Sequence, residues 1–191
     1  MKEKTIKKED FITTKWAGGE TSQLAIYPED AIFSEKDFLW RISSATFSST
    51  ESNFSNFSGY QRYTLPLEGK LSLYHQGLYN RELDKYEVDY FDGHWNTSSR
   101  NTMDCMDYNF IIKGGNIGKL QILKEGDEYI LKGSQIITMF SMDEFVLNLN
   151  NNKEKRYIDG FSLFVIEIEN KETINIIKAN GPVIITEFII K

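Results

Sequence analysis

Short runs of β-branched and aromatic residues, separated by Gly, Asn, Asp and Ser, recur along the whole chain. Few segments show the periodicity of an amphipathic helix, so the pattern predicts strands joined by turns. Strands are expected at residues 23–27, 38–47, 63–75, 119–123, 129–131, 134–140, 145–149, 162–167, 173–177 and 183–190. Many short strands with turns about every 8–12 residues indicate a β-sandwich or barrel, here of jelly-roll type.

Three segments interrupt this pattern. Residues 28–36 are compatible with one short helix, and residues 48–61 and 92–107 read as long irregular loops. Long ordered loops in a compact β domain are where binding and catalytic residues concentrate. These two loops are therefore the first places to look for a site.

One expected strand carries a charge among apolar neighbours. Alternation along residues 38–47 places Arg41 on the same face as Ala45 and Phe47, and the opposite face includes Phe38 and Trp40. Both faces read as covered, so Arg41 is predicted to be buried. A buried guanidinium without partners costs several kcal/mol, so Arg41 requires either a protein carboxylate or an anionic ligand.

Composition narrows the class of protein. The chain has 191 residues, is 40% hydrophobic and has a net charge of -6. This balance argues against a nucleic-acid partner, because phosphate backbones require a basic surface. No apolar run reaches the length of a membrane span, and the first residues do not read as a secretory signal. With one cysteine, Cys105, the chain is expected in a reducing cytoplasm.

The usual signals of metal or nucleophilic chemistry are missing from the sequence. The two histidines, His75 and His94, are far apart, and each is expected to be a surface or strand-end residue. Cys105 follows Asp104, and a neighbouring acid disfavours a thiolate. Neither a metal nor another cofactor is therefore expected.

Six short polar and aromatic motifs fall within the first 110 residues. They are Trp16-x-Gly-Gly-x-Thr21, Trp40-Arg-Ile-Ser-x-Ala45, Phe57-x-Gly-x-x-Arg62, Leu67-Glu-Gly69, Phe91-x-Gly-x-Trp95 and Asp107-Tyr-Asn109. The motifs follow one another in the order seen in the HutD/Ves family, so the chain resembles that family over about residues 13–112. The resemblance implies a double cupin-like (RmlC-like jelly-roll) β-barrel in a single chain, without the usual cupin metal histidines.

The resemblance also implies a function. HutD members are associated with histidine utilisation, where regulation and binding of small carboxylic acids have been proposed, and Ves members with stress or cold response. No firm enzymatic activity is attached to the family. Many HutD members have an Asn-Gly-Gly-Gly run where this chain has Ala17-Gly18-Gly19-Glu20, which is closer to the Ves side. We expect an N-terminal cupin-like lobe at residues 1–112 and a C-terminal β lobe at residues 113–191, packed as one compact unit.

We predict a ligand site in the N-terminal lobe, where Arg41 and Arg62 could hold a carboxylate by charge-assisted hydrogen bonds. The other residues of this predicted site are Trp16, Thr21, Gln23, Glu68, Trp95, Asp107 and Asn109. In the alternative interpretation, Arg41–Asp107 and Arg62–Glu68 are closed structural ion pairs and no ligand binds.

Three functions remain open at this point. The first is a metal-free, non-enzymatic protein that binds a small organic acid metabolite, in a regulatory or stress-related role. The second is a metal-free isomerase or lyase with Glu68 or Asp107 as base and a tyrosine as acid. The third is an interaction protein with an exposed aromatic face around Phe54, Phe57 and Tyr60. Neither nucleic acid nor membrane is expected as a partner, and a homodimer is one assembly considered.

Overall fold

A computed structural model describes residues 1–133, 135–150 and 153–189. Two predicted strands extend beyond this range, at residues 134 and 190. Almost all regular structure is β, which confirms the predicted class. The chain divides into two compact units. We call residues 11–115 the N-terminal unit, and residues 1–10 together with 116–191 the C-terminal unit. Within the described residues, no helix has the length and apolar character needed to cross a membrane.

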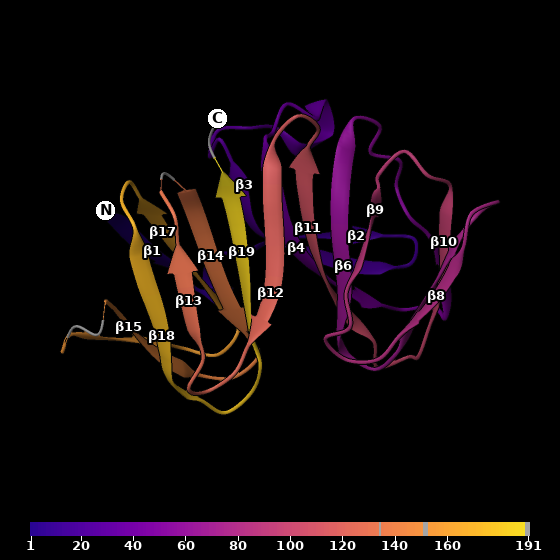
Figure 1. The fold of residues 1–191 in the computed structure, drawn as a ribbon. Helices are drawn as coiled ribbons and strands as arrows, with labels where there is room; N and C mark the ends of the chain where they lie inside the picture. The colour runs from indigo at the N-terminus through magenta and orange to yellow at the C-terminus, as the bar shows by residue number, and fades with distance from the viewer. Residues whose placement is uncertain (134, 151–152, 190–191) are drawn as a thin grey trace. The chain divides into compact units, whose positions relative to one another are not determined.

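The N-terminal unit contains two antiparallel sheets (Figure 1). The larger sheet has the order β2-β3-β4-β11-β6-β9, and the smaller has the order β5-β10-β7-β8. The strands of the larger sheet are β2 (Ile12–Trp16), β3 (Gly19–Tyr27), β4 (Trp40–Phe47), β11 (Met106–Lys113), β6 (Tyr60–Glu68) and β9 (Asp89–Asp92). Those of the smaller sheet are β5 (Glu51–Asn53), β10 (Thr97–Asn101), β7 (Leu71–His75) and β8 (Asn80–Leu83).

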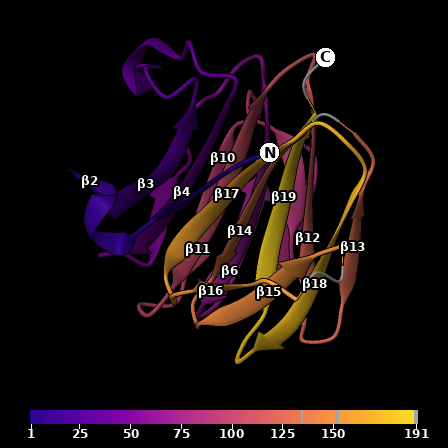
Figure 2. The ribbon, with the colours of Figure 1, turned by 90° about the vertical axis from the view of Figure 1, so that its left-hand side faces the viewer.

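The C-terminal unit also contains two antiparallel sheets, with the orders β1-β17-β14-β19-β12 and β13-β18-β15-β16. Figure 2 shows β17, β14, β19 and β12 side by side. The larger sheet comprises β1 (Lys2–Ile6), β17 (Ser162–Ile168), β14 (Gln135–Ser141), β19 (Val183–Ile189) and β12 (Ile117–Leu123). The smaller comprises β13 (Glu128–Leu131), β18 (Glu172–Ala179), β15 (Phe145–Leu149) and β16 (Lys155–Ile158).

The two units repeat one strand order. The order β4-β11-β6-β9 beside β5-β10-β7-β8 recurs as β12-β19-β14-β17 beside β13-β18-β15-β16. Each unit is therefore a jelly roll of eight strands in two facing sheets. In neither unit do the described residues close the sheets into one continuous barrel. The N-terminal unit adds β2 and β3 to this plan, and the C-terminal unit adds β1.

The predicted strand at residues 63–75 is divided at Gly69. Gly69 has φ +65°, and a Cβ there would lie 2.9 Å from the Cα of Cys105. Glycine adopts this left-handed conformation and tolerates this close approach, because it has no side chain. The chain therefore turns at Gly69 and enters the second sheet, so that β6 and β7 belong to different layers.

Several other predictions differ from the structure. The loop predicted at residues 48–61 contains β5, and the loop predicted at residues 92–107 contains β10 and the start of β11. The helix expected at residues 28–36 is reduced to one 3₁₀ turn, η2 (Phe33–Glu35), and a second, η1 (Lys8–Asp10), was not predicted. Strands β5 and β10 are short and polar, so they lack the alternation that identifies a strand in sequence.

The first ten residues do not join the N-terminal jelly roll. Strand β1 pairs along its length with β17, from Lys2 opposite Glu167 to Ile6 opposite Leu163. The expected N-terminal lobe, residues 1–112, includes this segment. Its lysine-rich pattern suits an exposed edge strand, which needs one neighbour only.

The interiors of the two units differ. The C-terminal unit contains a large apolar core to which both of its sheets contribute, including Ile137, Met139, Phe164, Val183 and Ile185. The N-terminal unit contains smaller apolar clusters. One includes Phe47, Leu71, Leu73 and Phe91, and another includes Ile26, Phe38, Phe57 and Ile111. A cavity with both charged and apolar walls is lined by members of both of these clusters.

Candidate functional site

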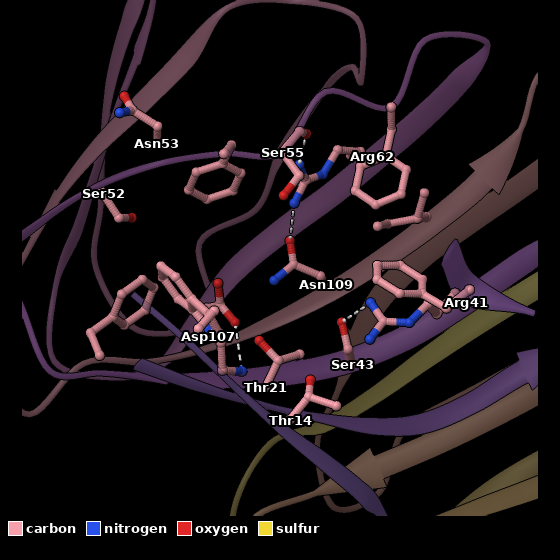
Figure 3. Close-up of a pocket in the computed structure, with 17 residues that line it drawn as sticks. Thr14, Thr21, Arg41, Ser43, Ser52, Asn53, Ser55, Arg62, Asp107 and Asn109 are labelled. Carbon is pink, nitrogen blue, oxygen red and sulfur yellow. Dashed lines mark hydrogen bonds between the residues drawn. The ribbon is translucent and has the colours of Figure 1, made fainter. Parts of the chain in front are cut away.

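A cavity of about 220 Å³ lies within the N-terminal unit (Figure 3). Its wall comes from β2, β3, β4, β6 and β11 of the larger sheet, and from residues 52–55, Phe57 and Phe33. The sheet supplies mainly polar side chains, while Phe33, Phe54 and Phe57 supply aromatic surface. The cavity thus has charged groups on one part of its wall and apolar rings on another.

Strand register places two arginines in one row of the sheet. On β11, Ile111 is opposite Arg41 of β4 on one side and Arg62 of β6 on the other. Neighbouring strands lie about 4.8 Å apart, so the backbones of the two arginines are separated by roughly 10 Å. In the next inward-facing row, Asn109 lies between Ser43 and Thr64. The two guanidiniums therefore face the same cavity from positions two strands apart.

Arg41 is 6% exposed and is held by neutral partners. Its Nε donates to Gln23 Oε1 at 2.8 Å, and its Nη1 donates to Ser43 Oγ at 3.0 Å. The guanidinium lies over the ring of Phe33 at 4.0 Å. Burial lowers the pKa of Arg41 to about 10, against an opposing effect from Asp107. It therefore carries a full positive charge at neutral pH.

Arg62 is also 6% exposed, and its contacts follow the same pattern. Nη2 donates to Asn109 Oδ1 at 2.9 Å, and Nη1 donates to the Ser55 carbonyl at 3.3 Å. The ring of Phe54 lies 4.6 Å from the guanidinium carbon. The buried Nε has no hydrogen-bond partner in the described part of the chain. Burial lowers the pKa of Arg62 to about 10; the charge of Asp107 opposes this shift and that of Arg41 adds to it.

The cavity wall contains one carboxylate, Asp107. Its Oδ1 accepts from the Ala45 amide at 2.9 Å, and the side chain of Asn109 also hydrogen-bonds to it. Burial raises the pKa of Asp107 to about 6, although these two hydrogen bonds and the charges of Arg62 and Arg41 oppose the shift. Asp107 is thus a buried acid that titrates close to neutrality.

The two cavity arginines differ from the other three of the chain. Arg81, Arg100 and Arg156 each pair with a carboxylate, at 4.0, 2.9 and 2.9 Å respectively. No carboxylate oxygen of the described residues lies within 4.0 Å of a guanidinium nitrogen of Arg41 or Arg62. The closed pair Arg41–Asp107 considered from sequence is therefore not formed. With Asp107 ionised, the cavity retains a surplus of one positive charge.

Most of the predicted site residues meet at this cavity. Trp16, Thr21, Arg41, Arg62, Asp107 and Asn109 line it. Gln23 lies behind Arg41 and orients its guanidinium. Gly19 lets the β2–β3 hairpin approach β4 closely, because a Cβ at this position would lie 3.0 Å from the Cα of Phe47. The hairpin thereby brings Trp16 and Thr21 to the cavity.

Two predicted residues lie elsewhere. Glu68 is ion-paired with Lys85 and half-exposed, so it neither neutralises Arg62 nor faces the cavity. The register of β6 against β11 shifts by one residue between Pro66 and Glu68, and such a bulge turns the Glu68 side chain away from the row that contains Arg62 and Thr64. Trp95 packs against His75, Tyr79 and Phe91 instead.

Sequence reasoning missed part of the cavity wall. The loop at residues 48–61 was expected to carry a site, but its lining residues 52–55 and Phe57 were not named as site residues, and neither were Thr14, Phe33 and Ser43. The aromatic face proposed around Phe54, Phe57 and Tyr60 does not exist: Phe57 and Tyr60 are each 4% exposed, and Phe54 packs against Phe91. The sequence did offer one signal for this wall. Phe54 and Phe57 lie within the polar segment 48–59, and guanidiniums stack on aromatic rings.

A second buried polar cluster connects the two sheets of this unit. His75 Nε2 hydrogen-bonds to Asp89 Oδ2 at 2.9 Å, and His75 Nδ1 to Thr97 Oγ1 at 2.8 Å. His75 is a strand-end residue, as expected, but it is fully buried. Within the described ranges, no group of three or more His, Cys, Asp or Glu side chains could hold a metal ion.

Comparison with known proteins identifies one family and one fold. A family model described as HutD matches residues 8–183. HutD from Pseudomonas fluorescens SBW25 (formate condition) has a TM-score of 0.78 at 19% identity, with 98% of each chain covered. A conserved protein of unknown function from Pseudomonas aeruginosa PAO1 gives 0.80 at 21% identity, again with 98% of each chain covered.

More distant structures share the architecture. A mutant of the oxalate decarboxylase OxdC from Bacillus subtilis gives a TM-score of 0.60 at 5% identity and covers 96% of this chain and 76% of its own. A search of curated protein sequences finds no match. These likenesses confirm the predicted all-β, double cupin-like fold.

Proposed function

The chain belongs to the HutD family, and we propose that its N-terminal unit binds a small carboxylate anion between Arg41 and Arg62. One observation carries this proposal. Two buried guanidiniums face a single cavity, and the one carboxylate of its wall, Asp107, forms an ion pair with neither of them. Uncompensated buried charge is costly, so the fold retains it where a ligand supplies the counter-charge.

The hydrogen-bonding capacity of the arginines supports an oxyanion as ligand. The guanidinium is a planar fork of donors that matches a carboxylate. The buried Nε of Arg62 has no partner among the described residues, and an unsatisfied buried donor costs about 1–3 kcal/mol. A bound anion beside Arg62 would offset this cost. Each charge-assisted hydrogen bond would then contribute about 1.5–3 kcal/mol.

The size and lining of the cavity limit the ligand. About 220 Å³ is below the roughly 300–1,000 Å³ of pockets that hold drug-sized molecules. The rings of Phe33, Phe54 and Phe57 could pack against a short carbon chain or a small ring. Formate, formylglutamate and urocanate are acids of the appropriate size range. Formate is also suggested by a relative, because one structure of P. fluorescens HutD is described by its formate condition.

The role we propose is regulatory: occupancy of the site by an acid metabolite, rather than its conversion, would carry the signal. Family membership supports a connection with histidine utilisation. A role in stress response is the alternative within the same proposal. Both roles require reversible binding of a small acid.

Asp107 favours a second candidate function. A buried carboxyl that titrates near neutrality and faces a cavity can act as a general base. An isomerase or lyase acting on a small acid is therefore the alternative, with Asp107 in the role for which Glu68 is excluded by its position. Turnover of a candidate acid, followed by proton NMR and lost in Asp107→Asn, would establish this alternative.

Calorimetric titration tests the proposed binding function. We expect formate, formylglutamate or urocanate to bind the wild-type protein, and Arg41→Ala and Arg62→Ala to abolish the binding heat. Arg62→Met is the milder variant, because a buried charge is often replaced by an apolar side chain of similar volume at little cost in stability.

Arg100→Ala is the matched control. Arg100 is exposed and pairs with Glu51, so its replacement by alanine removes the same charge outside the cavity. Circular dichroism establishes that each variant is folded. Unchanged binding in both cavity variants would exclude the proposed site.

A further inference from the structure

The charges inside the cavity define how much negative charge a ligand can bring. Among the residues that the structure describes, three ionisable side chains line the wall: Arg41, Arg62 and Asp107. Two positive charges and one negative charge leave a surplus of one. A monocarboxylate would bring the sum to zero, whereas a dicarboxylate would leave the buried site with one excess negative charge.

Excess charge in a buried site is resolved by a proton. Both ends of a dicarboxylate would lie in a cavity of about 220 Å³ that also contains the carboxyl of Asp107. Carboxylates that share such a site raise each other's pKa values, so one of them is protonated. Asp107 is the group prepared for this, because burial already raises its pKa to about 6.

Among the described groups around Asp107, no other can take up the proton. Arg41 faces it from β4 and Arg62 from β6, and both charges favour its ionised form. Burial, together with the charges of Asp107 and Asp104, raises the pKa of the Cys105 thiol to about 12, so the thiol stays neutral. Thr21 and Trp16, from β3 and β2, do not ionise. The lining residues among 52–57 are also non-ionisable.

We propose that the cavity accepts one net negative charge, so that a dicarboxylate binds together with one proton on Asp107 and a monocarboxylate binds without it. This inference rests on the proposed binding function and adds to it a rule for ligand charge. Affinity for dicarboxylates then falls as pH rises, while affinity for monocarboxylates does not. A change in pH would alter which class of acid occupies the site.

Succinate and succinamate form a matched pair of probes, because they are close in size and differ by one negative charge. Titration calorimetry in Tris and in triethanolamine measures proton uptake, since the two buffers differ in ionisation enthalpy. Amine buffers are needed because phosphate would compete for the arginines. We expect uptake of close to one proton with succinate and little with succinamate at about pH 7.5, where Asp107 is mostly ionised in the empty site.

The same linkage fixes the pH dependence. Succinate affinity should fall about tenfold per pH unit between about pH 6.5 and pH 8.5, while that of succinamate stays nearly constant. In Asp107→Asn, proton uptake with succinate should disappear, and its affinity should no longer depend on pH. Asp104→Asn, which alters an exposed acid outside the cavity wall, should behave as wild type.

Two results would overturn the proposal while leaving acid binding in place. One is succinate binding without proton uptake. The other is uptake that persists in Asp107→Asn, which would put the proton on the ligand. Failure of both acids to bind would instead remove the proposed function together with this inference.

Discussion

Asn109 Oδ1 accepts a hydrogen bond from Arg62 Nη2 at 2.9 Å, so the charge of Arg62 is met by a neutral group. The same oxygen accepts from Thr64 Oγ1 at 2.8 Å. An aspartate at this position would convert the contact into a closed ion pair. We therefore expect Asn109→Asp to weaken binding of small acids at least about tenfold, or about 1.4 kcal/mol.

Calorimetric titration with formate, formylglutamate or urocanate measures this effect. Asn96→Asp is the control, because Asn96 is exposed and the substitution adds the same charge outside the cavity. Equal affinities in wild type and Asn109→Asp would show that the surplus charge is irrelevant to binding.

Asp107 makes the stability of the protein depend on pH in a defined direction. Its pKa is about 6 in the folded protein, above the roughly 3.9 of an unfolded chain. Below about pH 4 the carboxyl is protonated in both states and does not change the free energy of unfolding. Its ionisation lowers that free energy progressively between about pH 4 and pH 6, and the loss is complete above this window. Asp107→Asn should therefore be more stable than wild type by about 1–3 kcal/mol at neutral pH, and equal to it near pH 4.

Urea unfolding at several pH values checks this prediction. The control is Asp104→Asn, because a hydrogen bond from Thr102 lowers the pKa of the exposed Asp104 carboxyl, the opposite direction. A stability gain from Asp107→Asn that is the same at all pH values would contradict the assignment of the raised pKa to this residue.

His75 is a structural residue that joins β7, β9 and β10. Both ring nitrogens are hydrogen-bonded, and replacement by alanine would leave Asp89 and Thr97 buried without this partner. We expect His75→Ala to lower the free energy of unfolding by about 2–4 kcal/mol. His94→Ala, which changes the exposed histidine, should cost less than about 0.5 kcal/mol in the same urea titration.

Gly69 determines where the chain leaves one sheet for the other. Alanine there would adopt an unfavourable φ of +65° and would collide with Thr102 and Cys105. Gly77 has φ +76° but open space around it, so it isolates the backbone term. We expect Gly69→Ala to cost more than about 2 kcal/mol and Gly77→Ala about 1 kcal/mol, measured by thermal unfolding. Similar costs at both sites would show that the close approach is relaxed.

The all-β class and the burial of Arg41 follow from alternation, since that pattern reports directly which positions face the interior. The meeting of Arg41 with Arg62 does not follow in this way. It depends on both residues pairing with Ile111, a register that connects three strands distant in sequence. The motif resemblance identified both arginines without revealing that neighbourhood.

The failures have physical causes as well. Glu68 was misplaced because a bulge alters side-chain direction without changing the composition of the strand. Strands β5 and β10 were read as loops because they are short and polar, and their ladder hydrogen bonds come from partners far along the chain. Phe54 was expected at the surface, since sequence does not show that the charge of Arg62 lies beneath it.

The recurrence of one strand order in both units separates the backbone plan from the presence of a binding site. In the C-terminal unit, β19 directs Val183 and Ile185 into an apolar core. In the N-terminal unit, the corresponding strand β11 directs Asp107 and Asn109 to the cavity. Protein engineers could exploit this equivalence: trimming bulky residues such as Met139 or Phe164 offers a route to a second, artificial receptor in the same chain. Its stability cost would be that of the core removed, about 2–5 kcal/mol for each large side chain.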